Sequence, residues 1–490
     1  MRRLIFAKFL VIAVFVFLFA GSSVVFGQNV VNKGPKTYYI SPYGNNMNDG
    51  SEEKPWASPA YGCKKMKAGD TMIIQSGHYL IRNRQEVISP PSGRYGAWIT
   101  IKGDEKGRPI LFGDSNLLAV INVAGRSYVR IENLEITSRT ENSYGWEGGE
   151  YGGGVREGIE AGGSYGGEGY VSNIILSNIE IHNVEETGLR LAGNSRYVMF
   201  EKLNIHHTGR NCIDIPSKSG SGMHNVVITE STLSFAGHFS RGKDQPSSYK
   251  DPDGLRADAS GDKLEIRKSL IEHNRGDGID SRCSGTAVIQ TIVANNSADN
   301  LKFRGVGSRA ENTLIYGDGD GNPDNGKCGS IVIDSRKPGK YEFINVTVDD
   351  NPARQGDPVY IQAENKTPIT LVLKNCIFVY GNRGFNLGDS VTLKAVNNIF
   401  YRKGQSFETA VHAGGKDYLT EDLVNLGKGN FSADPMFKNP AWGERGDYQL
   451  MPGSPAIDNG SDQDAPRVDL DGKPRPKGKA PELGCYETRR

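Results

Sequence analysis

The amino-acid sequence predicts an all-β chain that is wound as a single-stranded, right-handed parallel β-helix, or β-solenoid. Pairs of short alternating strands, joined at a polar kink, recur along the chain from Tyr128–Ile136 to Val391–Phe400. In the tightest run, Ser269, Thr291 and Thr313 follow one another at intervals of 22 residues. Alternation buries one face of each strand, and because one coil cannot bury that face alone, successive coils must stack. The right-handed winding is expected from the handedness of parallel crossover connections.

The kink between the paired strands carries a second regularity. Asparagine occupies it at five places, which are Asn133, Asn178, Asn345, Asn375 and Asn397. Asparagine tolerates the left-handed backbone region, so we expect that conformation here, with a ladder of side chains along the stack.

Two other folds with many short strands fit the sequence less well. A β-propeller would need repeats of about 40 residues or more, and a β-sandwich would not repeat one kink.

The N-terminus resembles a secretory signal. Arg2, Arg3 and Lys8 flank an apolar stretch, Phe9–Ala20, which is followed by small residues. We therefore expect residues 1–27 to be a signal peptide and the protein to be secreted, either extracellular or periplasmic. An uncleaved membrane anchor is the alternative, and after cleavage we expect no stable membrane insertion.

The mature part, residues 28–490, is expected to be one β-helix domain. An N-terminal starting segment is placed at 38–112, the central coils at 120–402 and a Pro- and Gly-rich C-terminal cap at 433–486, because solenoids need covered ends.

The net charge and the cysteine content indicate which kinds of ligand and partner the protein can bind. The net charge is +1 over 490 residues, so nothing in the charge balance favours nucleic acid, and an acidic substrate must be held by local Lys and Arg. The six cysteines form no CxxC pair, which argues against zinc. Cys376 lies in a strand pattern and is expected to be a buried free thiol. We expect a monomer.

Three carboxylate-bearing turns between Asp251 and Gly305 suggest a site. In stacked coils Asp253, Asp277 and Asp280 would converge, with Lys302 one coil away. Clustered carboxylates favour a hard cation such as Ca²⁺, and a lysine beside them is a candidate general base. The plain alternatives are Asx-turns for the aspartates and a solvated lysine.

Two insertions interrupt the repeat, and each is either part of a binding surface or a surface loop without a binding role. The Gly-rich segment Glu141–Tyr170 carries aromatic residues, which suits either stacking on sugar rings or a flexible loop. The segment Gly317–Gly326 resembles a calcium loop, but Pro323 stands where an EF-hand needs glycine, so a solvated turn is expected.

The three turns resemble those of family nine of the polysaccharide lyases, which act mainly on pectate. The matching segments are Pro252–Leu255, Gly276–Asp280 and Asp299–Gly305. The resemblance implies that Asp253, Asp277 and Asp280 bind Ca²⁺ and that Lys302 is the Brønsted base. This chain departs from the pattern at three positions: Gly276 replaces a carboxylate, Ile279 a tryptophan and Arg304 a leucine.

The expected activity is Ca²⁺-assisted β-elimination on a uronate-containing polysaccharide, with pectate or polygalacturonate first. Arg304, Arg282 and Arg256 are expected to bind the acidic substrate, and the arginines with Ca²⁺ are expected to lower the pKa of Lys302. The alternatives are an alginate or rhamnogalacturonan lyase, a glycoside hydrolase that uses Asp277 and Asp280, a uronate epimerase, and a β-helix that binds without catalysis.

Overall fold

In the structure, a computed structural model, the described residues from Pro35 onward belong to one compact unit. The structure describes residues 34–138, 153–162, 169–217, 222–317, 319, 329–350, 358–363, 367–381, 385–403 and 409–488. The expected signal peptide, residues 1–27, lies outside the described residues, as do Cys328 and most of the two insertions at 141–170 and 317–326.

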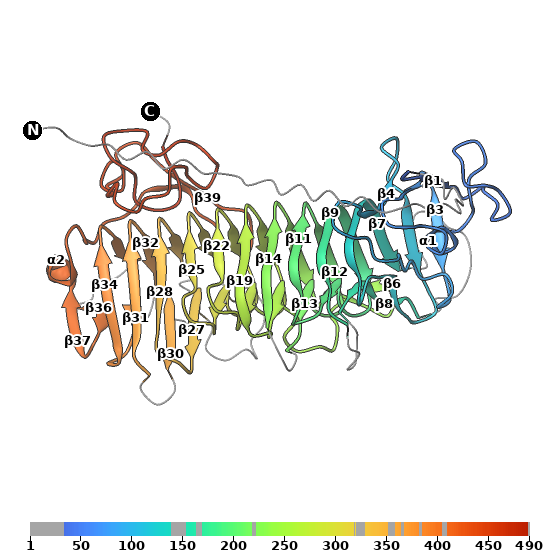
Figure 1. Ribbon diagram of the computed structural model, residues 1–490. Coiled ribbons are helices and arrows are strands. Elements are labelled where there is room, and N and C mark those ends of the chain that lie inside the picture. The colour runs from blue at the N-terminus through green and yellow to red at the C-terminus, as the bar shows by residue number, and fades with distance from the viewer. Residues whose placement is uncertain are drawn as a thin grey trace, which may run out of the picture. The chain divides into compact units, whose positions relative to one another are not determined.

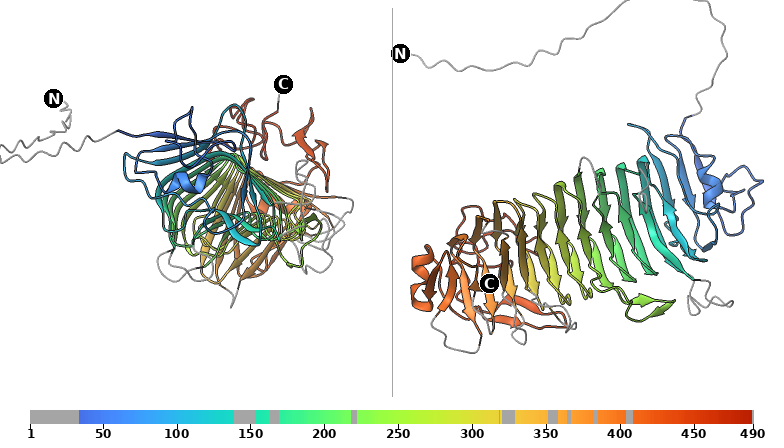
Figure 2. Two further views of the ribbon diagram at one scale, coloured as in Figure 1. Left: turned by 90° about the vertical axis from the view of Figure 1, so that its right-hand side faces the viewer. Right: turned by 90° about the horizontal axis from the view of Figure 1, so that it is seen from below.

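Residues 35–490 form a parallel β-helix, which confirms the predicted fold class (Figures 1 and 2). Three parallel sheets run along it, and strands that face one another in a sheet come from successive coils. The first sheet contains β1 (Thr37–Ile40), β2 (Thr71–Ile74), β4 (Ile99–Gly103), the first halves of β7 (Ser127–Ser138) and β9 (Ser172–Val184), β11 (Arg196–Glu201), β14 (Met223–Thr229), β19 (Gly261–Arg267), β22 (Ala287–Ile289), β25 (Arg309–Glu311), β28 (Gly339–Ile344), β31 (Ile369–Lys374) and β34 (Val391–Val396).

The second sheet follows the first after the kink, and β7 and β9 run through both. It contains β3 (His78–Ile81), β5 (Ile110–Gly113), the second halves of β7 and β9, β12 (Asn204–Thr208), β15 (Thr232–Ala236), β20 (Leu270–Glu272), β23 (Ile292–Ala294), β26 (Leu314–Tyr316), β29 (Thr347–Asp349), β32 (Ile377–Tyr380) and β35 (Ile399–Arg402).

The third sheet has nine strands and carries the predicted site residues. It contains β6 (Leu117–Asn122), β8 (Val155–Ala161), β10 (Leu189–Leu191), β13 (Ile213–Ile215), β18 (Leu255–Ala257), β21 (Ile279–Ser281), β24 (Leu301–Phe303), β27 (Ile331–Ser335) and β30 (Val359–Ala363).

The remaining elements are short. They are α1 (Pro59–Cys63), α2 (Leu423–Leu426), the 3₁₀ turn η4 (Thr420–Asp422), β16 (Phe239–Ser240), β17 (Lys243–Asp244), β33 (Phe385–Asn386), β36 (Thr409–Ala413), β37 (Lys416–Leu419), β38 (Phe437–Asn439) and β39 (Asp447–Leu450). No helix of the described part of the chain is long and apolar enough to cross a membrane.

The sequence period corresponds to one coil. Leu270, Ile292 and Leu314, each one residue after Ser269, Thr291 and Thr313, pair directly in β20, β23 and β26. Inward side chains of all three sheets merge into one continuous buried cluster. Cys376 lies within it as a fully buried free thiol, as expected.

The kink asparagines adopt the predicted backbone. Their φ angles are 58° (Asn133), 52° (Asn178), 52° (Asn345), 54° (Asn375) and 53° (Asn397). Parts of the expected ladder form: the Asn178 amide donates to Asn133 Oδ1 at 3.0 Å, and the Asn375 amide donates to Asn345 Oδ1 at 3.3 Å.

The C-terminal kink asparagines also hold the cap segment, residues 433–486. The Asn345 amide donates to the carbonyl oxygen of Gly484 at 3.0 Å, and the Asn375 amide donates to that of Ser461 at 2.9 Å. This segment therefore lies along the flank of the last coils (Figure 1). At the other end, residues 38–112 supply β1 to β5, whose in-register pairing makes this starting segment the first coils of the helix.

Candidate active site

The outer face of the third sheet presents a row of charged side chains. In each short strand the first and third residues point into the core and the middle residue points outward, as in Leu255-Arg256-Ala257 of β18. Parallel pairing places Arg256 beside Asp280, and Asp280 beside Lys302. Strand register thus assembles three of the predicted site residues on one face.

Three aspartates occupy the same corner, two residues before these strands. Asp253 Oδ1 accepts the backbone N–H of Asp277 at 2.8 Å, Asp277 Oδ1 accepts that of Asp299 at 3.0 Å, and Asp299 Oδ1 accepts that of Gly329 at 3.0 Å. We call Asp253, Asp277 and Asp299 the aspartate ladder. One oxygen of each carboxylate accepts a backbone N–H of the next coil, 22 to 30 residues later, so these bonds are not Asx-turns, which join residues two apart. The second oxygen of each carboxylate remains for other contacts.

The predicted ligands converge. Asp253, Asp277 and Asp280 are buried, and each offers one carboxylate oxygen within 4.8 Å of the others. In the described residues this is the one group of three or more His, Cys, Asp or Glu side chains with such proximity. Asp280 Oδ1 is buried and has no hydrogen-bond partner among those residues. Close carboxylate oxygens, one of them without a partner, fit an oxygen-preferring divalent cation.

Electrostatics supports the same fit. Burial, and then the charges of Asp277 and Asp280, raise the pKa of Asp253 well above its ordinary value. Burial and the charge of Asp277 raise the pKa of Asp280 to about 6 and that of Asp299 to about 7. Asp277 and Asp299 contact Lys302, and Asp280 contacts Arg304. Four carboxylates against two cations leave an excess of two negative charges when all are ionised, which a divalent cation would balance.

Gly276 explains one departure from the family pattern. A Cβ atom at this position would lie 2.4 Å from Asp253 Oδ1 and 2.8 Å from the backbone carbon of Asp251. Asp253 cannot easily yield, because the same oxygen accepts the Asp277 N–H. The corner therefore has no space for a carboxylate at position 276.

Lys302 lies inside the carboxylate cluster. Its Nζ is 2.7 Å from Asp299 Oδ2 and 3.2 Å from Asp277 Oδ2, and its side chain is 20% exposed. Burial alone lowers the pKa of Lys302, but the charges of Asp277 and Asp299 outweigh it and raise the pKa above its ordinary value. The prediction that the pKa of Lys302 is lowered is therefore wrong for the protein residues alone, because Lys302 contacts carboxylates rather than arginines.

The three predicted arginines divide into two groups. Arg304 donates to Asp280 Oδ2 at 2.8 Å and so belongs to the carboxylate cluster. Arg256 and Arg282 lie beside this cluster and share Asp258. Arg256 Nε donates to Asp258 Oδ2 at 2.8 Å, and Arg282 Nε donates to Asp258 Oδ1 at 2.8 Å.

Sequence reasoning missed Asp299 and an upstream part of the charged row. Asp299 occupies the ladder corner and contacts Lys302. Farther upstream on the same face, Arg190 Nε donates to Glu157 Oε1 at 2.6 Å, and its Nη1 donates to Asp214 Oδ2 at 2.8 Å. The signal was a recurring triplet with a charged centre between two core residues, as in Leu189-Arg190-Leu191 and Ile213-Asp214-Ile215.

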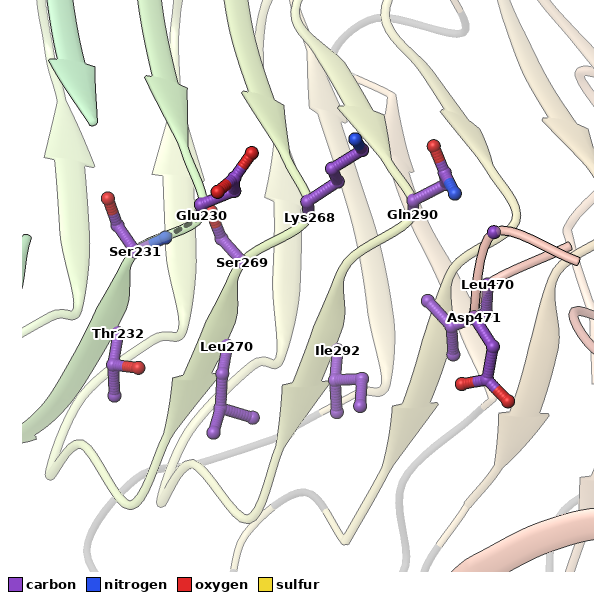
Figure 3. Close-up of a pocket in the computed structure, with 11 residues that line it drawn as sticks. Glu230, Ser231, Thr232, Lys268, Ser269, Leu270, Gln290, Ile292, Leu470 and Asp471 are labelled. Atoms are coloured by element: carbon purple, nitrogen blue, oxygen red, sulfur yellow. Dashed lines mark hydrogen bonds between the residues drawn. The ribbon is translucent and has the colours of Figure 1, made fainter. Parts of the chain in front are cut away.

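A separate cavity of about 450 Å³ lies at the kink, between the first and second sheets and under the cap segment (Figure 3). Its polar lining includes Glu230, Lys268, Gln290 and Asp471. None of the predicted site residues lines it, so the cavity is distinct from the charged face of the third sheet.

Comparisons with known proteins support the fold. No family model matches the chain, so membership of family nine stays a prediction. The uncharacterized protein YwoF of Bacillus subtilis (strain 168) is 32% identical over 77 residues, a match that spans 16% of this chain and 16% of that relative.

Solved structures with similar folds have low identity. XylC in complex with xylose matches 93% of this chain and 98% of its own at 9% identity, with a TM-score of 0.50. Pectate lyase Pel9A matches 93% and 97% at 15% identity, with a TM-score of 0.44. A rhamnogalacturonan lyase matches 85% and 97% at 14% identity, with a TM-score of 0.41. At these identities the likeness is one of fold.

Proposed function

We propose that this protein is a secreted polysaccharide lyase that cleaves a uronate-containing polysaccharide by β-elimination. The observation that carries the proposal is the joint presence, on one face of the third sheet, of three carboxylates with oxygens within 4.8 Å of one another and a lysine that contacts one of them, Asp277. Pectate or polygalacturonate is the first candidate substrate, because the three turns resemble those of family nine.

Asp253, Asp277 and Asp280 are the residues that would hold Ca²⁺. When bound there, the cation supplies positive charge beside the uronate carboxylate, where negative charge develops as the C5 proton leaves. The protein contributes preorganisation: the ladder hydrogen bonds fix Asp253 and Asp277, and the Arg304 contact fixes Asp280.

Lys302 takes the C5 proton in this proposal. Asp299, whose Oδ1 is tied to the Gly329 N–H, accepts a hydrogen bond from Nζ and so orients the amine. Because the neighbouring carboxylates favour the ammonium form, only the deprotonated fraction can act as a base. Product formation should therefore rise with pH.

Arg304 positions the substrate carboxylate. Its guanidinium is anchored by Asp280 on one nitrogen and offers further N–H donors in a planar fork. Arg256 and Arg282, paired through Asp258, supply positive charge to adjoining sugars.

The experiment is a panel of polygalacturonate, alginate and rhamnogalacturonan, with Ca²⁺ and with chelator, in which the ultraviolet absorbance of an unsaturated uronate product is followed. Ca²⁺-dependent absorbance supports the proposal and its strongest signal names the polymer. New reducing ends without absorbance would instead indicate a hydrolase, altered uronate composition without cleavage an epimerase, and binding without turnover a non-catalytic β-helix.

A further inference from the structure

A cationic cavity adjoins the carboxylate cluster. It has a volume of about 190 Å³ and lies beyond the C-terminal ends of β21, β24 and β27. Four positive side chains line it, with one carboxylate: Arg282, Arg304, Arg336, Lys337 and Asp334. Successive coils thus each add a cation at one corner, since Arg282 follows β21, Arg304 follows β24, and Arg336 follows β27.

The side chains that line the cavity carry four positive charges and one negative charge. Asp334 Oδ2 is 3.5 Å from an Nη atom of Arg304. Arg282 contacts Asp258, but that carboxylate is already shared with Arg256. Arg304 Nε is buried and makes no hydrogen bond to any residue in the described part of the chain. The lining therefore brings more positive charge to the cavity than its one carboxylate, that of Asp334, can balance.

Such a lining suits an oxyanion. Guanidinium groups present planar donor pairs that match a carboxylate or a sulfate, and a partly enclosed position strengthens the attraction relative to open solvent. Arg304 belongs both to this cavity and to the carboxylate cluster, through its 2.8 Å contact with Asp280. A polymer that meets Lys302 would therefore place an adjoining sugar at the cavity.

We propose that this cavity is a subsite for an anionic group, a carboxylate or a sulfate ester, on a sugar next to the one that is cleaved. Arg336 and Lys337 are its specificity-determining residues. The assignment of the neighbouring sugar rests on the proposed function, whereas anion binding in the cavity does not. It follows that the preferred polymer carries acidic groups on successive sugars, rather than alternating acidic and neutral ones.

The test measures binding separately from turnover. Titration calorimetry with Ca²⁺ present would use a Lys302→Ala chain, with and without Arg336→Ala/Lys337→Ala. The probes are oligogalacturonate, the same oligomer with its carboxylates methyl-esterified, and sulfated dextran oligomers. Arg267→Ala/Lys268→Ala is the matched control, because it removes an adjacent exposed Arg-Lys pair at the kink instead.

We expect the Arg336→Ala/Lys337→Ala change to weaken oligogalacturonate binding roughly 5- to 30-fold, as for two ion pairs, and to leave the methyl ester and the control variant unaffected. A loss confined to sulfated dextran would assign the subsite to sulfate esters. Equal affinity with and without the change, an equal loss in the control, or no binding of any acidic probe would overturn the subsite. Charge-dependent binding in this test, together with no unsaturated product from the wild-type chain on the polymer panel, would retain the subsite and refute the lyase.

Discussion

The carboxylate cluster should make the stability of this protein fall as pH rises, and Ca²⁺ should restore it. Asp280 and Asp299 have pKa values raised to about 6 and about 7, chiefly by burial. A raised pKa means that the folded state binds the proton more tightly than the unfolded chain. The resulting stability is fully present below about pH 4 and is lost as pH rises through about 6 to 7.

The size of the effect follows from Asp280 alone. A rise from the ordinary value of 3.8 to about 6 corresponds to about 3 kcal/mol of the free energy of unfolding. A domain of this size shifts its thermal midpoint by roughly 1 °C per kcal/mol, so we expect a loss of roughly 3 °C. Ca²⁺ at a hundredfold excess over its Kd would add about 3 kcal/mol and reverse most of that loss.

The assay is thermal unfolding at about pH 4, where most of this stability is present, and at about pH 8, where it is lost, in chelator and in Ca²⁺. Glu157 and Glu482 also have pKa values raised to about 8 by burial, so the readout is the difference between wild type and Asp280→Asn, which cannot titrate at that site. Glu105→Gln, with a side chain 88% exposed, is the control and should behave as wild type. A wild-type midpoint that changes with pH no more than that of Asp280→Asn, or equal Ca²⁺ effects at both pH values, would refute the reasoning.

Three further outcomes are expected at single positions. Lys302→Ala should lower the rate of unsaturated product formation by about 10²–10⁴-fold, whereas Lys340→Ala should leave it unchanged; a near wild-type rate in Lys302→Ala would show that the base is misassigned. Asp253→Asn keeps the corner acceptor but loses the charge, so Ca²⁺ affinity by calorimetry should fall roughly tenfold or more, and an unchanged Kd would remove Asp253 from the ligand set. Gly276→Ala should lower stability by about 1–3 kcal/mol, because its Cβ would lie 2.4 Å from Asp253 Oδ1, and a denaturation midpoint equal to wild type would contradict this packing.

The coils of the β-helix could be predicted from the sequence because each pattern that indicates them is local. Alternation, the 22-residue interval and asparagine at the kink each report on backbone geometry within one coil, and register then follows from stacking. The same logic brought Asp253 and Asp277 together, since equivalent positions of successive coils must be neighbours, and Asp280 follows Asp277 in the same turn. The position of the cap segment was less accessible, because it depends on contacts such as Asn375 to Ser461, between residues far apart in the sequence.

The protonation of Lys302 could not be predicted, because it depends on which charges are nearest. In sequence Lys302 is two residues from Arg304, which would lower its pKa, and three from Asp299, which would raise it. The sequence does not decide which of the two is nearer in space. In the structure its Nζ contacts Asp299 and Asp277, while Arg304 turns to Asp280. Side-chain direction at a corner, rather than sequence distance, decides the sign of the pKa shift.

The aspartate ladder separates what the fold requires from what the site requires. One coil upstream of Asp253, Asn211 Oδ1 accepts the Asp253 N–H at 2.8 Å, the same distance at which Asp253 Oδ1 accepts the Asp277 N–H. A neutral amide therefore joins two coils with the same geometry. The carboxylates of Asp253 and Asp299 do this with a pKa raised by burial and by the charge of Asp277, which means that their ionisation destabilises the folded chain. Hydrogen bonding between coils does not explain charged residues at consecutive corners, whereas the proposed binding of a cation on this face would explain them.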